Sequence, residues 1–209
     1  MSIADIRQQY RKGVLLENAI ASNPFDQFMQ WFDDALKSEV NEPNAMTLAT
    51  VADGQPSARI VLLKGFDAQG PVFFTNYESD KGRQLAVNAK AALLFFWPEL
   101  ERQVRFEGVV TRVSAQESDE YYHSRPLESR IGAWASPQSR PITRAELDQR
   151  VKDLTANLGD TPQRPEYWGG YRLTPARVEF WQGRPSRLHD RLCFERQPDN
   201  AWSLQRLAP

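Results

Sequence analysis

Hydrophobic residues recur at helical spacing near the start of the chain. Phe25, Phe28 and Phe32 lie on one face of a segment that follows Asn23 and Pro24. Asn is a favoured helix N-cap, and Pro is tolerated in the first helical turn. The pattern therefore predicts a helix that begins at Pro24 and packs against a core.

Short apolar and β-branched runs follow, separated by turn residues such as Asp53-Gly54. Capping patterns at Ser79, Ser114 and Thr143 predict three more helices, which end near residues 88, 125 and 158. The expected strands cover residues 45–51, 57–64, 72–75, 93–97, 103–113, 177–181, 188–196 and 201–207. Closely spaced strands with short turns favour an antiparallel sheet or small barrel. We predict a mainly β fold with peripheral helices.

Composition narrows the class of protein. The 209 residues include one Cys and two His, which exclude an intrachain disulfide and a Cys-rich zinc site. A net charge of −1 without a basic stripe argues against nucleic acid as a partner. The longest apolar run, 91–97, is too short to span a membrane, and charged residues interrupt the N-terminus where a signal peptide would be apolar. We expect a cytoplasmic protein with no membrane partner.

Common nucleotide motifs are absent from the sequence. There is no Gly-rich dinucleotide turn, no phosphate-binding GxxxxGK[ST] loop and no GxSxG elbow. A nucleotide or flavin would therefore be held by a different arrangement of side chains.

Two candidate anion sites lie in the first half of the chain. Arg59 and Lys64 are five residues apart, so they point to opposite faces of a strand and suit two separate anions. The alternative is that both are solvated strand ends. Lys81 lies at a predicted helix start, where N–H groups favour an anion, although Ser79 is also explained as an ordinary cap.

Two more candidate clusters follow. Tyr121, Arg125 and Ser129 are spaced by four residues, and their hydroxyl and guanidinium groups suit a phosphate. Chance assembly is the alternative. Further along, Arg187, His189 and Arg191 are each two residues apart, so they would share one face of a strand. Such a cationic face suits an anionic or electron-rich ligand. The alternative is a solvated edge strand.

The stretch VEFWQGRPSRLHDR at 178–191 resembles the signature of the pyridoxine/pyridoxamine 5′-phosphate oxidase family. The resemblance extends in the same order from about residue 7 to residue 209. Its other segments are RIVLLK at 59–64, FFTN at 73–76, ERQVRFEG at 101–108, YYHSRP at 121–126, IGAWAS at 131–136 and the terminal RLAP.

The resemblance implies an FMN-binding split β-barrel that forms a homodimer with FMN at the interface. It implies a mobile N-terminal segment at 1–23 and a single domain at 24–209. Family members oxidise pyridoxine or pyridoxamine 5′-phosphate to pyridoxal 5′-phosphate, with O2 as acceptor and H2O2 as product. The alternatives are a split-barrel flavoprotein with another substrate and a non-catalytic protein that binds FMN or pyridoxal phosphate.

The resemblance also implies the site residues, with no metal among the ligands. The cofactor set is Arg59, Ile60, Val61, Leu62, Leu63, Lys64, Phe74, Thr75, Lys81, Gln103, Gln138, Ser139, Trp181 and Arg191. The substrate set is Arg7, Tyr10, Lys64, Tyr121, Arg125, Ser129, Arg187 and His189, of which the last two are the expected catalytic residues. One position departs from the family, since Asp80 stands where members often carry Arg. Either Asp80 turns away from the phosphate or Arg83 supplies the charge.

Overall fold

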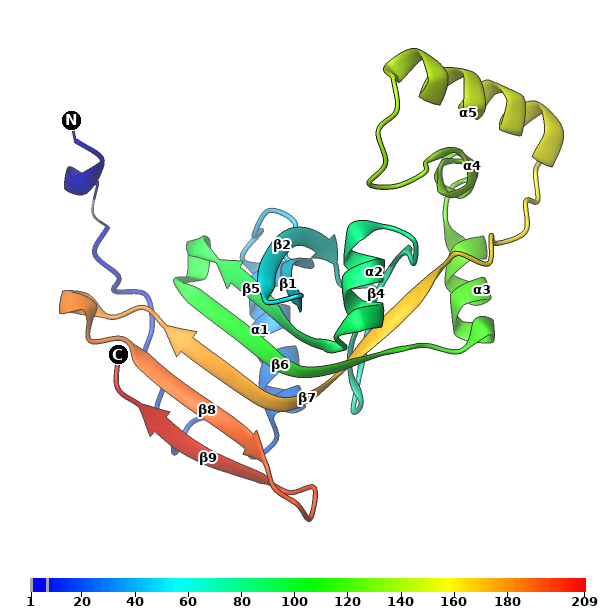
Figure 1. Cartoon of the computed structure of the whole chain (residues 1–209). Helices are drawn as coiled ribbons and strands as arrows, with labels where there is room; N and C mark the ends of the chain where they lie inside the picture. Colours follow the sequence, from blue (N-terminus) through cyan, green and yellow to red (C-terminus); the bar gives the residue numbers. More distant parts are fainter. Residues whose placement is uncertain (1, 7) are drawn as a thin grey trace.

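The computed structural model describes residues 2–6 and 8–209, which form one antiparallel sheet surrounded by helices (Figure 1). This confirms the predicted mainly β class. The strands are β1 Ala45–Ala52, β2 Gln55–Leu62, β3 Gly65–Asp67, β4 Gly70–Asn76, β5 Lys90–Trp97, β6 Arg102–Arg112, β7 Trp168–Gln182, β8 Asp190–Arg196 and β9 Trp202–Leu207. The α-helices are α1 Pro24–Lys37, α2 Asp80–Val87, α3 Ala115–Ser124, α4 Leu127–Ala135 and α5 Arg144–Leu158. Short 3-10 turns lie at Ile3–Asp5, Pro98–Leu100 and Pro185–Arg187.

Strand β7 organises the sheet. The strand order is β2-β1-β5-β6-β7-β4-β3, and β8 and β9 extend from β7 outside this path. Strand β6 pairs with β7 along nearly its whole length, whereas the other edge of β7 is divided: residues 168–172 pair with β4 and residues 177–182 pair with β8. The sheet therefore forks at the middle of β7.

A bulge marks the fork. The register shifts between Glu107 and Gly108, so that these residues face Arg177 and Pro175 and leave Ala176 without a partner on β6. A Cβ on Gly108 would lie 2.1 Å from the carbonyl oxygen of Thr174. Only glycine permits this close approach, and it lets β7 bend between its two pairings (Figure 1).

The predicted helix at Pro24 is confirmed as α1, capped by the Asn23 side chain. Its buried face is Pro24, Gln27, Phe28, Trp31 and Ala35. Met29 and Leu36 also recur at helical spacing, yet they are largely exposed. The helix thus covers the barrel core with its aromatic stripe, where Phe28 contacts rings from β3, β5 and β6.

Helices α3 and α5 confirm the capping patterns at Ser114 and Thr143. Helix α4 was not predicted, because Pro126 at its N-cap position makes no side-chain capping bond. Helix α5 has no buried residue and packs on α4 at the periphery of the molecule (Figure 1). Among the described residues, no helix combines the length and apolar character that crossing a bilayer requires.

Phe28→Ala tests the core under α1. The Phe28 side chain is fully buried, with its ring centroid 4.4 Å from that of Phe66 and 5.0 Å from that of Phe95. The free energy of unfolding should fall by about 3–5 kcal/mol, because the substitution leaves a cavity. Met29→Ala, on the exposed side of the same helix, should change it by less than about 1 kcal/mol. Urea denaturation measures both; equal losses would contradict this packing.

Candidate active site

A polar pocket with a volume of about 440 Å³ lies beside the forked sheet. Side chains from β2, β4, α2, α3, α4 and the start of β7 enclose it. It is lined by Ile60, Val61, Leu62, Lys64, Phe74, Thr75, Asn76, Lys81, Tyr121, Arg125, Ser129, Gly132, Ala133, Ser136, Gln138 and Trp168.

Lys81 forms one cationic corner of the pocket. Its Nζ donates to Thr75 Oγ1 at 3.2 Å and to Gln138 Oε1 at 3.4 Å. Partial burial lowers the pKa of Lys81, and the nearby positive charge of Arg59 lowers it further. Two cations that raise each other's electrostatic energy suit an anion placed between them. Ser139, whose Oγ accepts the N–H of Asp80 at 3.1 Å, lies at the same corner.

Arg59 and Lys64 occupy different environments, but not as opposite faces of one strand, because only Arg59 lies on β2. The Arg59 guanidinium is held behind the pocket, where it donates to Thr50 Oγ1 at 2.6 Å and Gln84 Oε1 at 2.7 Å. Burial lowers its pKa. Strand β2 ends at Leu62, so Lys64 lies beyond the strand and lines the pocket directly.

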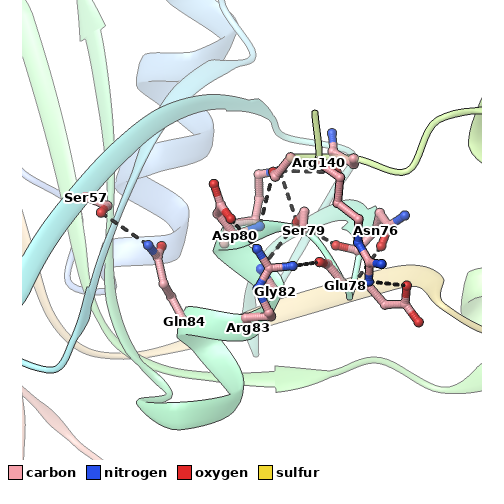
Figure 2. A network of polar contacts seen from close by, with 12 residues as sticks. Ser57, Asn76, Glu78, Ser79, Asp80, Gly82, Arg83, Gln84 and Arg140 are labelled. Atoms are coloured by element: carbon pink, nitrogen blue, oxygen red, sulfur yellow. Dashed lines mark hydrogen bonds and ion pairs between the residues drawn. The ribbon is translucent and has the colours of Figure 1, made fainter. Parts of the chain in front are cut away.

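The departure at Asp80 has a structural explanation. Asp80 is the first residue of α2, and its carboxylate pairs with Arg83. The same guanidinium also donates to the carbonyl oxygen of Glu78, as Figure 2 shows. Arg83 therefore neutralises Asp80 at the surface and does not line the pocket.

Arg125 forms a second cationic corner. Its guanidinium carbon lies 4.6 Å from the centroid of the Trp168 ring, and its NH1 atom is buried without a hydrogen-bond partner. Burial lowers the pKa of Arg125. A buried guanidinium nitrogen without a partner is costly unless a ligand supplies an acceptor. This corner is therefore built for an anion.

Tyr121 and Ser129 share that corner, although they come from different helices. Residue Arg125 ends α3 and Pro126 begins the approach to α4, yet all three predicted phosphate residues line the pocket. The Tyr121 ring stacks on Phe74 with centroids 4.0 Å apart, and burial raises the pKa of its hydroxyl. The tyrosine is thus a neutral donor beside Arg125.

A second group of predicted residues gathers at the opposite end of β7. The ring of Tyr10 lies 5.7 Å from Trp181 and 5.8 Å from His189, and the last two rings are 4.6 Å apart. Gln103 is the cross-strand partner of Trp181. Arg191 donates to the buried carboxylate of Glu179 at 2.9 Å.

The prediction that Arg187, His189 and Arg191 share one strand face is wrong. Strand β8 begins only at Asp190. Pro185 opens a 3-10 turn in which Ser186 and Arg187 adopt positive φ values of 57° and 61°. This tight turn ends the extended backbone, so only Arg191 lies on the strand.

His189 is held by the backbone after this turn. Its Nδ1 accepts the N–H of Arg184 at 3.1 Å. Burial lowers the pKa of His189, and the charge of Arg187 lowers it further. The imidazole is therefore neutral at pH 7 and carries its proton on Nε2, which is free to act as a donor.

The described structure does not bring the two groups together within one chain. None of the second group lines the pocket, and Trp168 in the pocket and Trp181 in the second group lie at opposite ends of the bent strand β7 (Figure 1). Leu63 is buried in the core beneath the pocket. Arg7 lies outside the described residues. Among the residues described, no cluster of His, Cys, Asp or Glu is placed to hold a metal.

Several pocket residues were not found from the sequence. These are Asn76, Gly132, Ala133, Ser136 and Trp168. Asn76 and Ser136 end segments that the family resemblance contains, so their positions carried a usable signal. Trp168 carried none, because the first half of β7 was not predicted as a strand.

A mainly β fold whose pocket holds two separate cationic corners suits ligands with anionic groups. Comparison with known families is more specific. The model described as pyridoxamine 5′-phosphate oxidase matches residues 32–182, and the model of the pyridoxine 5′-phosphate oxidase C-terminal dimerisation region matches residues 168–209. The chain belongs to the pyridoxine/pyridoxamine 5′-phosphate oxidase family of enzymes.

Relatives of the same name are similar over their whole length. The pyridoxine/pyridoxamine 5′-phosphate oxidase of Bordetella petrii is 63% identical and that of Pseudomonas paraeruginosa 61%, with at least 99% of each chain covered. Among solved structures, PhzG from Burkholderia lata, in complex with tetrahydrophenazine-1-carboxylic acid, has a TM-score of 0.87 at 32% identity, covering 94% of this chain and 98% of its own. A pyridoxamine 5′-phosphate oxidase-related, FMN-binding protein from Nostoc punctiforme shares the fold, with a TM-score of 0.73 at 17% identity, covering 91% of this chain and 100% of its own.

Arg125→Met tests the second cationic corner. It keeps the packing on Trp168 but removes the unpaired NH1 donor. Because charge-assisted hydrogen bonds contribute about 1.5–3 kcal/mol, a phosphate monoester should bind about 10- to 100-fold more weakly. Isothermal titration calorimetry with pyridoxal 5′-phosphate measures this, and Arg144→Met on exposed α5 is the matched control. Equal affinity of both variants would contradict the assignment.

Proposed function

We propose that the chain is an FMN-dependent oxidase that converts pyridoxine or pyridoxamine 5′-phosphate to pyridoxal 5′-phosphate, with O2 as acceptor and H2O2 as product. One observation carries the proposal: a single pocket has cationic corners at Lys81 and at Arg125. Two phosphorylated ligands, a cofactor and a substrate, account for both corners. The names of the full-length relatives support the same reaction.

The Lys81 corner fits the phosphate of FMN. Lys81, Gln138 and Ser139 offer donors there, with Arg59 behind them. Strand β2 pairs only with β1 among the described strands, so backbone groups of residues 60–62 on its other edge are free to bind the ring of the flavin. Bound FMN supplies a two-electron acceptor that the side chains of the protein lack.

The Arg125 corner fits the phosphate of the substrate. Arg125 presents its unpaired NH1, and Tyr121, Ser129 and Lys64 add donors around it. The stacked rings of Phe74, Tyr121 and Trp168 hold these donors in place before any ligand arrives. A fixed phosphate contact orients the rest of the substrate for reaction.

The second group completes the site in a homodimer with FMN at the interface. Because Trp181, Arg187 and His189 lie away from the pocket of their own chain, they reach a substrate in a pocket only if it belongs to a second copy. The match to a dimerisation region over residues 168–209 supports this arrangement, since it contains all three residues. In the dimer, Gln103 and Arg191 approach the same cofactor.

In this arrangement His189 orients the pyridine ring. Its Nε2 holds a proton at neutral pH, because Nδ1 already accepts the N–H of Arg184. A donor at that position binds an oxygen or nitrogen acceptor of the substrate, and Arg187 stabilises negative charge that develops beside it. The domain boundary at residue 24 and the cytoplasmic location remain predictions that belong to this proposal. The expected mobility of 1–23 remains one too, although Arg11, Lys12 and Leu15 donate backbone hydrogen bonds to Glu101 and Asp190.

One other substrate class has an observation in its favour. The PhzG structure was solved with a tetrahydrophenazine carboxylic acid, and its chain is similar to this one over nearly its whole length. A ring carboxylate would also accept from Arg125. A non-catalytic protein that binds FMN or pyridoxal phosphate is the further alternative.

Oxygen uptake by the purified protein separates these functions. We expect a yellow protein that consumes O2 and releases H2O2 with pyridoxamine 5′-phosphate or pyridoxine 5′-phosphate. Uptake only with a reduced ring carboxylic acid would support the alternative substrate, and flavin binding without any uptake would support the non-catalytic protein. A colourless protein that FMN cannot reconstitute would overturn the proposal.

The pH dependence of kcat/KM tests His189. Its pKa lies below the ordinary 6.5, so the neutral form predominates at pH 7 and is lost as the pH falls further. Protonation removes the Nδ1 acceptor, so kcat/KM should decrease on an acid limb whose midpoint lies below the ordinary value for histidine. His189→Asn should lower kcat/KM about tenfold and remove this acid limb. His123→Asn, at an exposed position on α3, should keep the limb; an identical profile in both variants would exclude a role for His189 titration.

A further inference from the structure

Glu101 binds the N-terminal segment, although it lies 90 residues away in sequence. One carboxylate oxygen, Oε2, accepts the backbone N–H of Arg11 at 2.7 Å and that of Lys12 at 2.8 Å. The side chain is only 7% exposed. A buried carboxylate is unfavourable without hydrogen-bond partners. Because the two backbone N–H groups are its partners here, this contact holds the N-terminal segment in place.

The local backbone is built to present this carboxylate. Glu101 follows the 3-10 turn at Pro98–Leu100 and has a left-handed φ of 55°, which is unfavourable for a residue with a side chain. Its own carbonyl oxygen accepts the N–H of Gly183 at 2.8 Å and the side-chain amide of Gln182 at 3.2 Å. Glu101 therefore joins the N-terminal segment to the end of β7.

Two glycines allow the segment to lie this close. A Cβ on Gly13 would lie 2.7 Å from Gln182 Oε1, and a Cβ on Gly183 would lie 2.7 Å from the Tyr10 ring. Further along, the N–H of Leu15 donates to Asp190 Oδ2 at 3.1 Å. Residues 10–15 are thus fixed at two points, and Tyr10 is the first residue beyond the Glu101 contact.

We propose that Glu101 is a positioning residue for substrate binding, which acts through Tyr10. By holding the backbone of Arg11 and Lys12, it keeps the Tyr10 ring against Trp181 and His189. The inference rests on the proposed function, in which this group contacts the phosphorylated pyridine substrate. Tyr10 then covers the ring of that substrate, and Glu101 fixes the position of the backbone that follows Tyr10.

Kinetics of the FMN-loaded enzyme test the proposal. Glu101→Ala should raise KM for pyridoxamine 5′-phosphate about tenfold, with kcat changed less than about threefold and FMN affinity unchanged. Glu101→Gln keeps an acceptor oxygen and should recover part of the loss. Because Glu101 acts through Tyr10, the double variant Glu101→Ala/Tyr10→Ala should show the KM of Tyr10→Ala alone. Additive effects, or an unchanged KM in Glu101→Ala, would overturn the proposal.

Limited proteolysis gives a readout that does not depend on turnover. Trypsin cleaves after Arg11 and Lys12, whose N–H groups Glu101 holds, so the holoenzyme of Glu101→Ala should be cut there about tenfold faster than the wild type. Glu99→Ala is the matched control, because Glu99 contacts Lys12 through its backbone oxygen alone. Equal cleavage rates in the wild type and Glu101→Ala would overturn the conclusion that Glu101 holds the N-terminal segment.

A third variant keeps the test decisive if Glu101→Ala does not fold. Gly13→Ala disturbs the same segment while leaving the Glu101 carboxylate intact, because the added methyl meets the buried side-chain amide of Gln182. It should raise both KM and the cleavage rate, as Glu101→Ala does. If neither value changed, the result would count against the proposal. A wild-type enzyme without oxidase activity would refute the proposed function instead, while the proteolysis result would still decide whether Glu101 holds the segment.

Discussion

The hydrogen bonding of β7 is the constraint on which the rest of the structure depends. Its edge opposite β6 serves β4 over residues 168–172 and β8 over residues 177–182, and the bulge at Ala176 separates the two pairings. The first pairing places Trp168 in the pocket, and the second places Trp181 beside His189, in the second group of predicted site residues. One strand therefore carries parts of two half-sites, and its bend holds them apart. This separation within one chain is the basis of the proposed site shared between two copies.

Charge placement explains why the pocket suits anions although the chain is nearly neutral. Several cations outside the pocket are paired with carboxylates, as Arg83 is with Asp80 and Arg191 is with buried Glu179. Those of the pocket are not matched in this way: Lys81 faces neutral oxygens, and a nitrogen of Arg125 has no partner at all. Both are partly desolvated, which strengthens their interaction with a phosphate. The net charge of −1 is thus a poor guide to local potential.

Sequence patterns predicted the elements with clear local signals and missed those fixed by tertiary contacts. Caps at Ser114 and Thr143 located α3 and α5. The first half of β7 was missed; it includes Gly169, where a Cβ would lie 2.2 Å from the Tyr77 hydroxyl. Tyr121, Arg125 and Ser129 were predicted from their chemistry and the family resemblance, and all three line the pocket. Glu101 was not found, since its role depends on a contact 90 residues away along the chain, which no local pattern records.

The single thiol has a consequence for experiments on the folded protein. Cys193 is fully buried on β8, where its Sγ accepts Arg177 Nε at 2.9 Å, and burial raises its pKa. An alkylating reagent reaches it only when β8 separates from its neighbours, because a buried thiol is unreactive. The rate of labelling therefore reports how often the β7–β8–β9 side of the fork opens, without any engineered probe. The chain thus contains its own reporter for the stability of the region that matches a dimerisation domain.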